Sequence, residues 1–371
     1  MKRFILLCLP LSFFFLFCGC LQSTELKDTA IIGAAAVDYQ EGQFYLTMQM
    51  FDPTAGGGEN NVNLDALSSK TVTTQGRTLG EAIADCERLQ GKEIFYQRCE
   101  LLILSREAAK KVLPHVVEFF CRTGRSSLSA QVAVAEGWAG ELLSIQMDQG
   151  TLASNRIASL LRHASEEGRA VASPLLEVAA DLAAAQGTAA LPILKAQEDP
   201  SAPVSMERTA IIQDGALGLI LEKKETTALC WLMGNLKSTI FNLSPNPEQL
   251  YAVEARRTGF SIHPKLYQDR LYLDVHCQVK GALFEKVSGR TGEEDREAAE
   301  KTLTESLSTD LEYLLHKLLI QNGADLFHLS QLVRQQFPSF YEEHQNALSE
   351  MFRSAKIQIS MEAQVFKASG L

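Results

Sequence analysis

Residues 271–283 read LYLDVHCQVKGAL, and apolar side chains occupy every second position from Leu271 to Val279. Successive side chains of a β-strand point to opposite faces, so this alternation predicts a strand with one buried face and one exposed face. Residues 260–266 are also rich in strand-forming side chains, and Gln268-Asp269 supplies a short polar turn between the two segments. The stretch therefore predicts a β-hairpin that turns one face toward a core.

A long amphipathic helix is predicted directly after this hairpin, over residues 293–321. Gly323 can adopt the left-handed conformation that ends a helix. Shorter helices are expected over 325–337 and 339–352, followed by a closing strand over 357–365. This combination predicts an α+β fold class, with a sheet covered by helices. The leucines on one face of the long helix are Leu303, Leu307, Leu311, Leu314 and Leu318.

The rest of the chain alternates strands with helices. Thr78 and Ser105 are suitable N-cap residues for two of the helices, because their hydroxyl groups can accept a free N–H of the first turn. The order of elements predicts a mixed sheet with packed helices in the first half. The predicted strands lie at 30–38, 44–51, 99–104, 131–135, 210–221 (a hairpin), 236–242 and 250–257, and the helices at 79–89, 105–122, within 140–186 and through Trp231.

A boundary between domains is expected at residues 197–205, which read QEDPSAPVS. This segment holds two prolines and almost nothing that could be buried. It divides the chain into an N-terminal domain, residues 30–198, and a C-terminal domain, residues 205–371. The length left after the leader suffices for two or three mixed α/β domains, each a β-sheet with packed helices.

The leader, residues 1–19, has the organisation of a signal peptide, with a basic start and an uncharged apolar run. The run is short for a bilayer span, which needs about 20 residues. Cys20 follows Gly19 directly, and this arrangement resembles the lipobox of bacterial lipoproteins. In that system the cysteine receives a diacylglyceryl thioether and becomes the new N-terminus. We therefore expect cleavage before Cys20, lipid attachment to Cys20 and a polar tether over 20–29.

Two alternatives remain open at the N-terminus. Cys18 is a second cysteine near the cleavage site, but the bulky Phe17 before it makes it a poor acceptor. The leader could also stay attached as an N-terminal helix, because no charge follows until Glu25. Both the lipoprotein and the uncleaved anchor place residues 21–371 outside the cytoplasm.

Charge and cysteine content exclude several classes of function. The formal net charge is −10 at pH 7, and loss of Lys2 and Arg3 with the leader lowers it by two. Nucleic-acid binding is disfavoured, because it requires a basic surface. The cysteines after the leader are odd in number and widely spaced, which favours buried thiols over a disulfide framework or zinc site, although one bridge stays possible. They are Cys86, Cys99, Cys121, Cys230 and Cys277.

Catalytic motifs are absent from the sequence. None of the seven histidines lies three or four positions from another, and neither H-E-x-x-H nor G-x-S-x-G occurs. Ser126 and Ser127 follow Gly124-Arg125, but no partner base can be placed. We expect neither an enzyme nor a cofactor or metal site. His263 and His276 lie on the predicted hairpin and could form a pH-sensitive or metal-binding pair, although isolated strand histidines are usually incidental.

The order of short motifs along the chain resembles the Ger(x)C family, the C-subunit lipoproteins of spore germinant receptors. The resemblance covers almost the whole mature length, and its most specific part is the gly-ala-asp-(any)-phe element within Asn322–Phe327. A leucine, Leu21, stands where the family commonly has a tryptophan after the lipidated cysteine. The other matching stretches are 25–28, 30–37, 51–53, 78–82, 101–104, 117–122, 231–234 and 333–338.

The resemblance implies a receptor subunit held by its lipid, diacylglycerol with palmitate as a typical acyl chain, on the outer face of the inner membrane of the spore. Its partners would be a membrane-embedded A subunit and a transporter-like B subunit, and a nutrient would act on the complex. Direct nutrient binding by this subunit is left open. An alternative from another class is an extracytoplasmic solute-binding lipoprotein that delivers a small ligand to a transporter.

Overall fold

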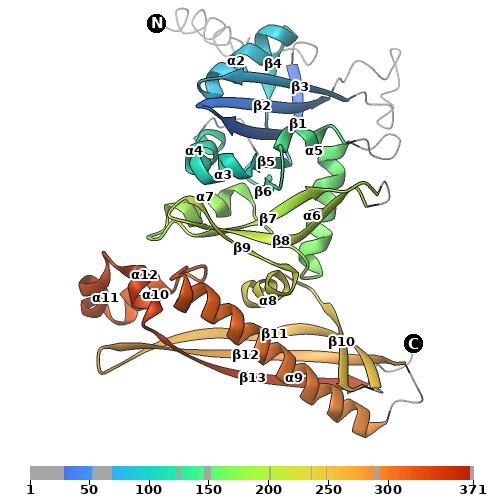
Figure 1. Ribbon diagram of the computed structural model, residues 1–371, viewed down its shortest axis with the longest axis vertical. Coiled ribbons are helices and arrows are strands. Elements are labelled where there is room, and N and C mark those ends of the chain that lie inside the picture. Colours follow the sequence, from blue (N-terminus) through green and yellow to red (C-terminus); the bar gives the residue numbers. More distant parts are fainter. Residues whose placement is uncertain are drawn as a thin grey trace, which may run out of the picture.

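The computed structural model describes residues 29–51, 69–122, 127–145, 152–199, 202–234, 236–247, 249–287 and 292–367. Within these residues the chain builds two β-sheets, one of nine strands and one of four, with helices packed on both (Figure 1). The two sheets lie at opposite ends of the long axis, and the helix α8 (Lys223–Met233) lies between them. The predicted fold class, mixed sheets with packed helices, is confirmed.

The first sheet has the order β3-β2-β1-β5-β6-β7-β8-β9, with the short β4 beside β1. Its centre is parallel, from β1 through β5 and β6 to β7, and both flanks are antiparallel. The strands are β1 (Thr29–Gln40), β2 (Gln43–Phe51), β3 (Ser69–Gly76), β4 (Glu93–Phe95), β5 (Leu101–Ser105), β6 (Gln131–Ala135), β7 (Ala189–Ala196), β8 (Val204–Gln213) and β9 (Ala216–Leu221).

Helices cover both faces of this parallel centre. In β1, Ala35 and Val37 pack into one hydrophobic cluster, while Ala34 and Ala36 pack into another on the opposite face. Burial on both faces explains why residues 30–37 are apolar without alternation. The helices are α2 (Leu79–Gln90), α3 (Arg106–Lys111), α4 (Leu113–Arg122), α5 (Ala139–Leu143), α6 (Ala153–Glu166) and α7 (Leu175–Ala183).

The predicted caps are present, but one predicted helix is divided. Thr78 accepts the N–H of Glu81 at the start of α2, as expected from the sequence. The single helix expected over 105–122 is instead α3 and α4, with Val112 outside helical geometry at φ −135°. Pro114 explains the break, because proline has no N–H to donate and is tolerated only in the first turn of a helix.

The segment at 197–203 connects β7 to β8, and these strands pair antiparallel within the first sheet. The break between the two sheets comes later, after β9, where α8 begins. Residues 197–203, within the segment expected at the boundary between domains, lie in sequence between these two paired strands.

The second sheet has the order β10-β11-β12-β13, and only β13 runs parallel to its neighbour. The strands expected at 250–257 and 260–266 form one long strand, β11, which continues through a register shift between Arg257 and Gly259. A β-bulge keeps the chain in the sheet while it bends the strand. The strands are β10 (Thr239–Asn246), β11 (Gln249–Tyr267), β12 (Arg270–Lys286) and β13 (Lys356–Lys367).

Helices cover one face of the second sheet. The predicted leucine stripe of α9 (Glu293–Leu315) is buried, and it belongs to the same hydrophobic cluster as the odd-numbered residues from Leu271 to Val279. The helix ends in a π-helical turn, His316–Gln321, and Gly323 adopts φ +64°. The remaining helices are α10 (Leu329–Gln336), α11 (Pro338–His344) and α12 (Leu348–Arg353).

Candidate functional site

The first sheet carries a surface recess where its parallel strands end. Asp38 near the end of β1, Ser105 at the end of β5 and Glu136 after β6 lie along the same edge of the sheet. In open sheets with parallel strands, ligands bind at this carboxyl edge. Two adjoining hollows occupy it, with volumes of about 460 Å³ and 640 Å³, and they share Asp38 and Trp138.

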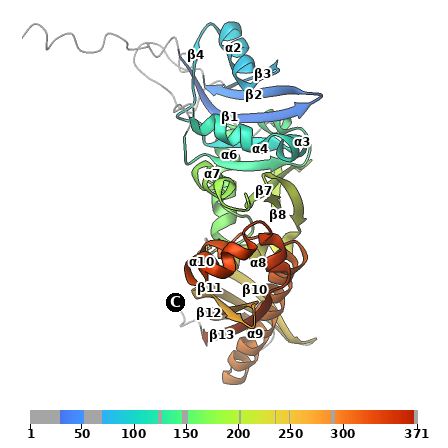
Figure 2. The same cartoon turned by 90° about the vertical axis from the view of Figure 1, so that its left-hand side faces the viewer.

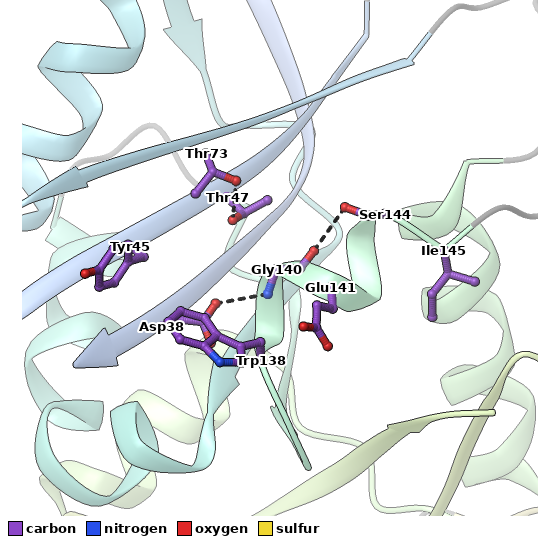
Figure 3. A pocket seen from close by; sticks show the side chains of 9 residues that line it. All are labelled: Asp38, Tyr45, Thr47, Thr73, Trp138, Gly140, Glu141, Ser144 and Ile145. Carbon is purple, nitrogen blue, oxygen red and sulfur yellow. Dashed lines mark hydrogen bonds between the residues drawn. The ribbon is translucent and has the colours of Figure 1, made fainter. Parts of the chain in front are cut away.

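Asp38 positions α5 beside this edge (Figure 3). Its side chain is 2% exposed, and its two carboxylate oxygens accept the N–H groups of Ala139 and Gly140 at 2.7 and 3.0 Å. Burial raises the pKa of Asp38, although both backbone hydrogen bonds oppose that change. Because its oxygens accept two N–H groups of the first turn of α5, Asp38 holds the start of this helix against β1.

The smaller hollow is lined by aromatic and hydroxyl-bearing side chains. Trp138 is 45% exposed, and its ring system and the ring of Tyr45 form a T-shaped contact with a centroid distance of 5.6 Å. Ser144 donates to the carbonyl of Gly140 rather than to a base. The lining residues are Asp38, Tyr45, Thr47, Thr73, Trp138, Gly140, Glu141, Ser144 and Ile145, and none of them is a histidine or cysteine. This set can make contacts, but it lacks an activated nucleophile.

A cluster of charges lies beside the larger hollow. The carboxylate of Glu136 is 2.6 Å from Arg208, 3.5 Å from Arg106 and 3.6 Å from Lys195. The hydrogen bond from Arg208 is the main cause that lowers the pKa of Glu136. Three cationic side chains therefore surround the carboxylate of Glu136 at this edge of the sheet.

The element within Asn322–Phe327 lies at the junction of the two halves. The side chain of Gln213, at the end of β8, donates to the carbonyl of Asn322 at 3.1 Å. The side chain of Gln186, before β7, accepts the N–H of Asp325 at 2.9 Å. This stretch therefore also connects the helices of the second sheet to the first sheet.

Asp325 caps the helix α10, which starts later than residue 325. Its two carboxylate oxygens accept the N–H groups of Leu329 and Ser330, each at 2.8 Å. The helix predicted from residue 325 begins at Leu329, because residues 325–328 form the turn that Asp325 closes. Neither glutamine at the junction could be recognised from the sequence, since no local pattern marks a polar side chain that bonds to a distant loop.

His263 and His276 lie on neighbouring strands as expected, with ring centroids 6.0 Å apart. Their register partners across the ladder are Asp274 and Ser261. Within the described part of the chain, no three histidine, cysteine or acidic side chains come together in a way that could hold a metal ion. His263 and His276 therefore lie close together, but within the described residues no third side chain joins them to form a metal site.

The cysteines of the described residues are free thiols, and four of them are buried, as expected from their apolar neighbours. Burial raises the pKa of Cys99 to about 11 and that of Cys230 to about 12, so these thiols stay protonated at neutral pH. The predicted lipid-attachment residue, Cys20, and the residues Gly124-Arg125-Ser126 lie outside the described residues. Over the ranges that are described, every helix is too short or too polar to cross a bilayer.

Two family models match consecutive parts of the chain. The spore germination protein N-terminal domain matches residues 22–196, and the spore germination B3/GerAC-like C-terminal domain matches residues 207–368. The unmatched residues between the two models, 197–206, comprise the connection between β7 and β8 and the first three residues of β8.

Individual relatives match over a similar length. Spore germination protein KC of Bacillus subtilis (strain 168) is 23% identical over 350 residues, which cover 88% of this chain and 86% of the relative. Spore germination protein B3 of the same organism is 20% identical over 344 residues, covering 90% of each chain. A crystal structure of the GerBC protein is similar in fold, with a TM-score of 0.60 at 16% identity over 90% of this chain and 97% of that one. Because the two family models together match most of its length, this chain belongs to the GerAC-like spore germination family.

Proposed function

We propose that this chain is the lipoprotein C subunit of a nutrient germinant receptor. The observation that carries the proposal is the match of both halves of the chain, in order, to the two domains of the spore germination family. In this proposal the subunit assembles with a membrane-embedded A subunit and a transporter-like B subunit. It acts by contact in this complex and has no catalytic role.

Membrane attachment is proposed to depend on Cys20. The leader at residues 1–19 has a basic start and an apolar run, and Cys20 follows Gly19 directly. Two or more acyl chains hold a protein stably on a bilayer, because each buried methylene contributes about 0.8 kcal/mol. The folded body then works from the outer face of the inner membrane of the spore.

The absence of catalysis in the proposal is supported by the chemistry of the recess. Among its hydroxyl-bearing side chains, Thr47 and Thr73 bond to each other and Ser144 donates to the carbonyl of Gly140. The buried carboxylate of Asp38 is occupied by backbone N–H groups. Activation of a hydroxyl group as a nucleophile requires a hydrogen bond to a general base, whereas Thr47, Thr73 and Ser144 bond to another hydroxyl or to backbone.

The two neighbouring cysteines allow a matched test of the anchor. The full chain is expressed with an alkyne-bearing palmitate analogue, and membranes are separated from the soluble fraction. The Cys20→Ala variant is expected to lose the label and to move to the soluble fraction, because without the cysteine sulfur no thioether to a diacylglyceryl group can form. The Cys18→Ala variant is expected to keep both the label and the membrane position. Retention of label and membrane attachment by Cys20→Ala would overturn the assignment of Cys20.

A further inference from the structure

The strand β13 forms one edge of the second sheet. Among the residues that the structure describes, it pairs only with β12, through twelve consecutive register partners from Lys356 to Lys367, and this ladder has no bulge. The strand lies on the side of the second sheet that is farthest from the first sheet (Figures 1 and 2). A long edge without a bulge or proline presents unpaired backbone groups to a further strand.

Val365 shows which backbone groups point outward. Its N–H donates to Glu300 at 2.9 Å and its carbonyl accepts from Arg296 at 3.2 Å, and both partners lie on α9. These groups therefore point away from β12. Because backbone groups alternate between the two edges of a strand, residues 357, 359, 361 and 363 direct their N–H and C=O groups to the same open side. Among the described residues, no hydrogen bond engages those groups.

The side chains along this edge are incompletely covered. Ile357, Ile359 and Met361 are half-buried against the core below α9. Their register partners on β12 are Leu273, Val275 and Cys277, which are 0–1% exposed. The difference arises because β12 has a strand on each side and β13 has only one. A further strand would cover the remaining apolar surface of this row.

We propose that β13 pairs antiparallel with the β13 of a second copy of this chain, around a two-fold axis at Ser360. The pairing places Ile359 opposite Met361 and Ile357 opposite Ala363, so the outward backbone groups of both copies bond to each other. On the exposed face Lys356 lies opposite Gln364, and Gln358 lies opposite Glu362. No two like charges face each other, so the edge is complementary to itself.

The proposed pairing joins the two second sheets into one continuous sheet, with both copies of α9 on the same face. The hydrogen bonds of Val365 to Arg296 and Glu300 limit it to residues 356–364. The first sheets then point away from each other at the two ends of the dimer.

Ser360 provides a test of the register, because its side chain is exposed on the open face and would meet its own symmetry mate. Directly opposed residues at a non-hydrogen-bonded position have Cα atoms about 4.5 Å apart, which suits a disulfide. The full-length chain in its native membranes carries Ser360→Cys, is oxidised with copper phenanthroline and is analysed on non-reducing gels. We expect at least ten-fold more disulfide-linked dimer than in the unmodified chain.

Gln358→Cys is the matched control, on the same strand and the same exposed face. The axis places it opposite Glu362, so it is expected to give no more dimer than the unmodified chain. The double variant Gln358→Cys with Glu362→Cys is expected to restore cross-linking. Equal cross-linking of Ser360→Cys and Gln358→Cys would overturn the proposal, as would no dimer from Ser360→Cys. An adduct of a different mass would also overturn it, because the edge would then take the strand of another protein.

Discussion

At the scale of single residues, Asp295 connects the start of α9 to two strands of the second sheet. Its carboxylate accepts the N–H of Gly292 at 2.7 Å, the ammonium of Lys286 at 2.9 Å and the hydroxyl of Tyr251 at 2.7 Å. These bonds, led by the backbone N–H of Gly292, lower the pKa of Asp295 from 3.8 to about 2. Folding therefore favours the ionised form of the Asp295 carboxyl group.

The low pKa predicts an acid-dependent contribution to stability. Because the pKa is depressed in the folded state, the contribution is present above pH 3.8 and is lost as the pH falls toward 2. Replacement by Asn removes it, so Asp295→Asn is expected to lower the free energy of unfolding by about 2 kcal/mol at neutral pH. Urea unfolding of both proteins at a series of pH values measures the difference. A difference that stays constant from pH 7 to pH 2 contradicts this account.

At the scale of elements, the loop between the π-helical turn and α10 depends on a close backbone approach. Gly323 has φ +64°, and a Cβ atom there would lie 2.7 Å from the carbonyl oxygen of Ser349 and 2.8 Å from its Cα. Gly42, in the turn between β1 and β2, has φ +80° but no atom within 4 Å of the same position. Both glycines therefore have a left-handed backbone that would strain any other residue, but only Gly323 lacks space for a Cβ atom.

This contrast predicts different costs for the same substitution. Gly42→Ala introduces only the strain of a left-handed alanine, about 1 kcal/mol. Gly323→Ala also pushes against the backbone of α12, so it is expected to cost several kcal/mol, about 3 or more. The free energies of unfolding in urea give both values. An equal decrease in the free energy of unfolding of the two variants would mean that the close approach of Ser349 does not destabilise Gly323→Ala.

Elements with a clear local signal could be predicted from the sequence. The alternation in β12, the leucine stripe of α9 and the N-cap Thr78 each act within a few residues. The errors arose where a tertiary environment overrides the local pattern. The bulge at Arg257 and Gly259, for example, continues β11 through a segment that looks like a break.

The candidate site was less predictable than the fold. Asp38 bonds to residues 101 and 102 positions away, and Gln186 bonds to a residue 139 positions away. Contacts of this separation depend on the three-dimensional path of the chain and leave no periodicity in the sequence. The junction role of the 322–327 element therefore became visible only in the structure.

At the scale of the whole molecule, the two sheets share a core. Ile211 and Leu221 of the first sheet belong to the same hydrophobic cluster as Trp231 of α8 and Val275 of the second sheet. The junction also includes the hydrogen bonds made by Gln186 and Gln213. A shared core makes independent unfolding of one half costly, because it exposes apolar surface on the other half.

The two tryptophans allow this coupling to be measured. Trp138 lies beside the first sheet and Trp231 lies within the shared core. In each of the variants Trp138→Phe and Trp231→Phe, the remaining tryptophan is expected to report the same urea midpoint as far-ultraviolet circular dichroism of the same protein. Fluorescence and dichroism midpoints that separate would show that the halves unfold independently.

Assembly in a membrane receptor is the central claim at this scale, and purification of the chain from spores tests it most directly. The full chain with a C-terminal tag is purified from detergent-solubilised inner membranes of dormant spores, and the proteins that accompany it are identified by mass spectrometry. The account predicts two membrane proteins in constant ratio to the tagged chain, one with the many spans of a transporter. It also predicts that spores without the chain fail to respond to the corresponding nutrient. A chain that purifies alone, from spores whose nutrient response does not depend on it, contradicts the account.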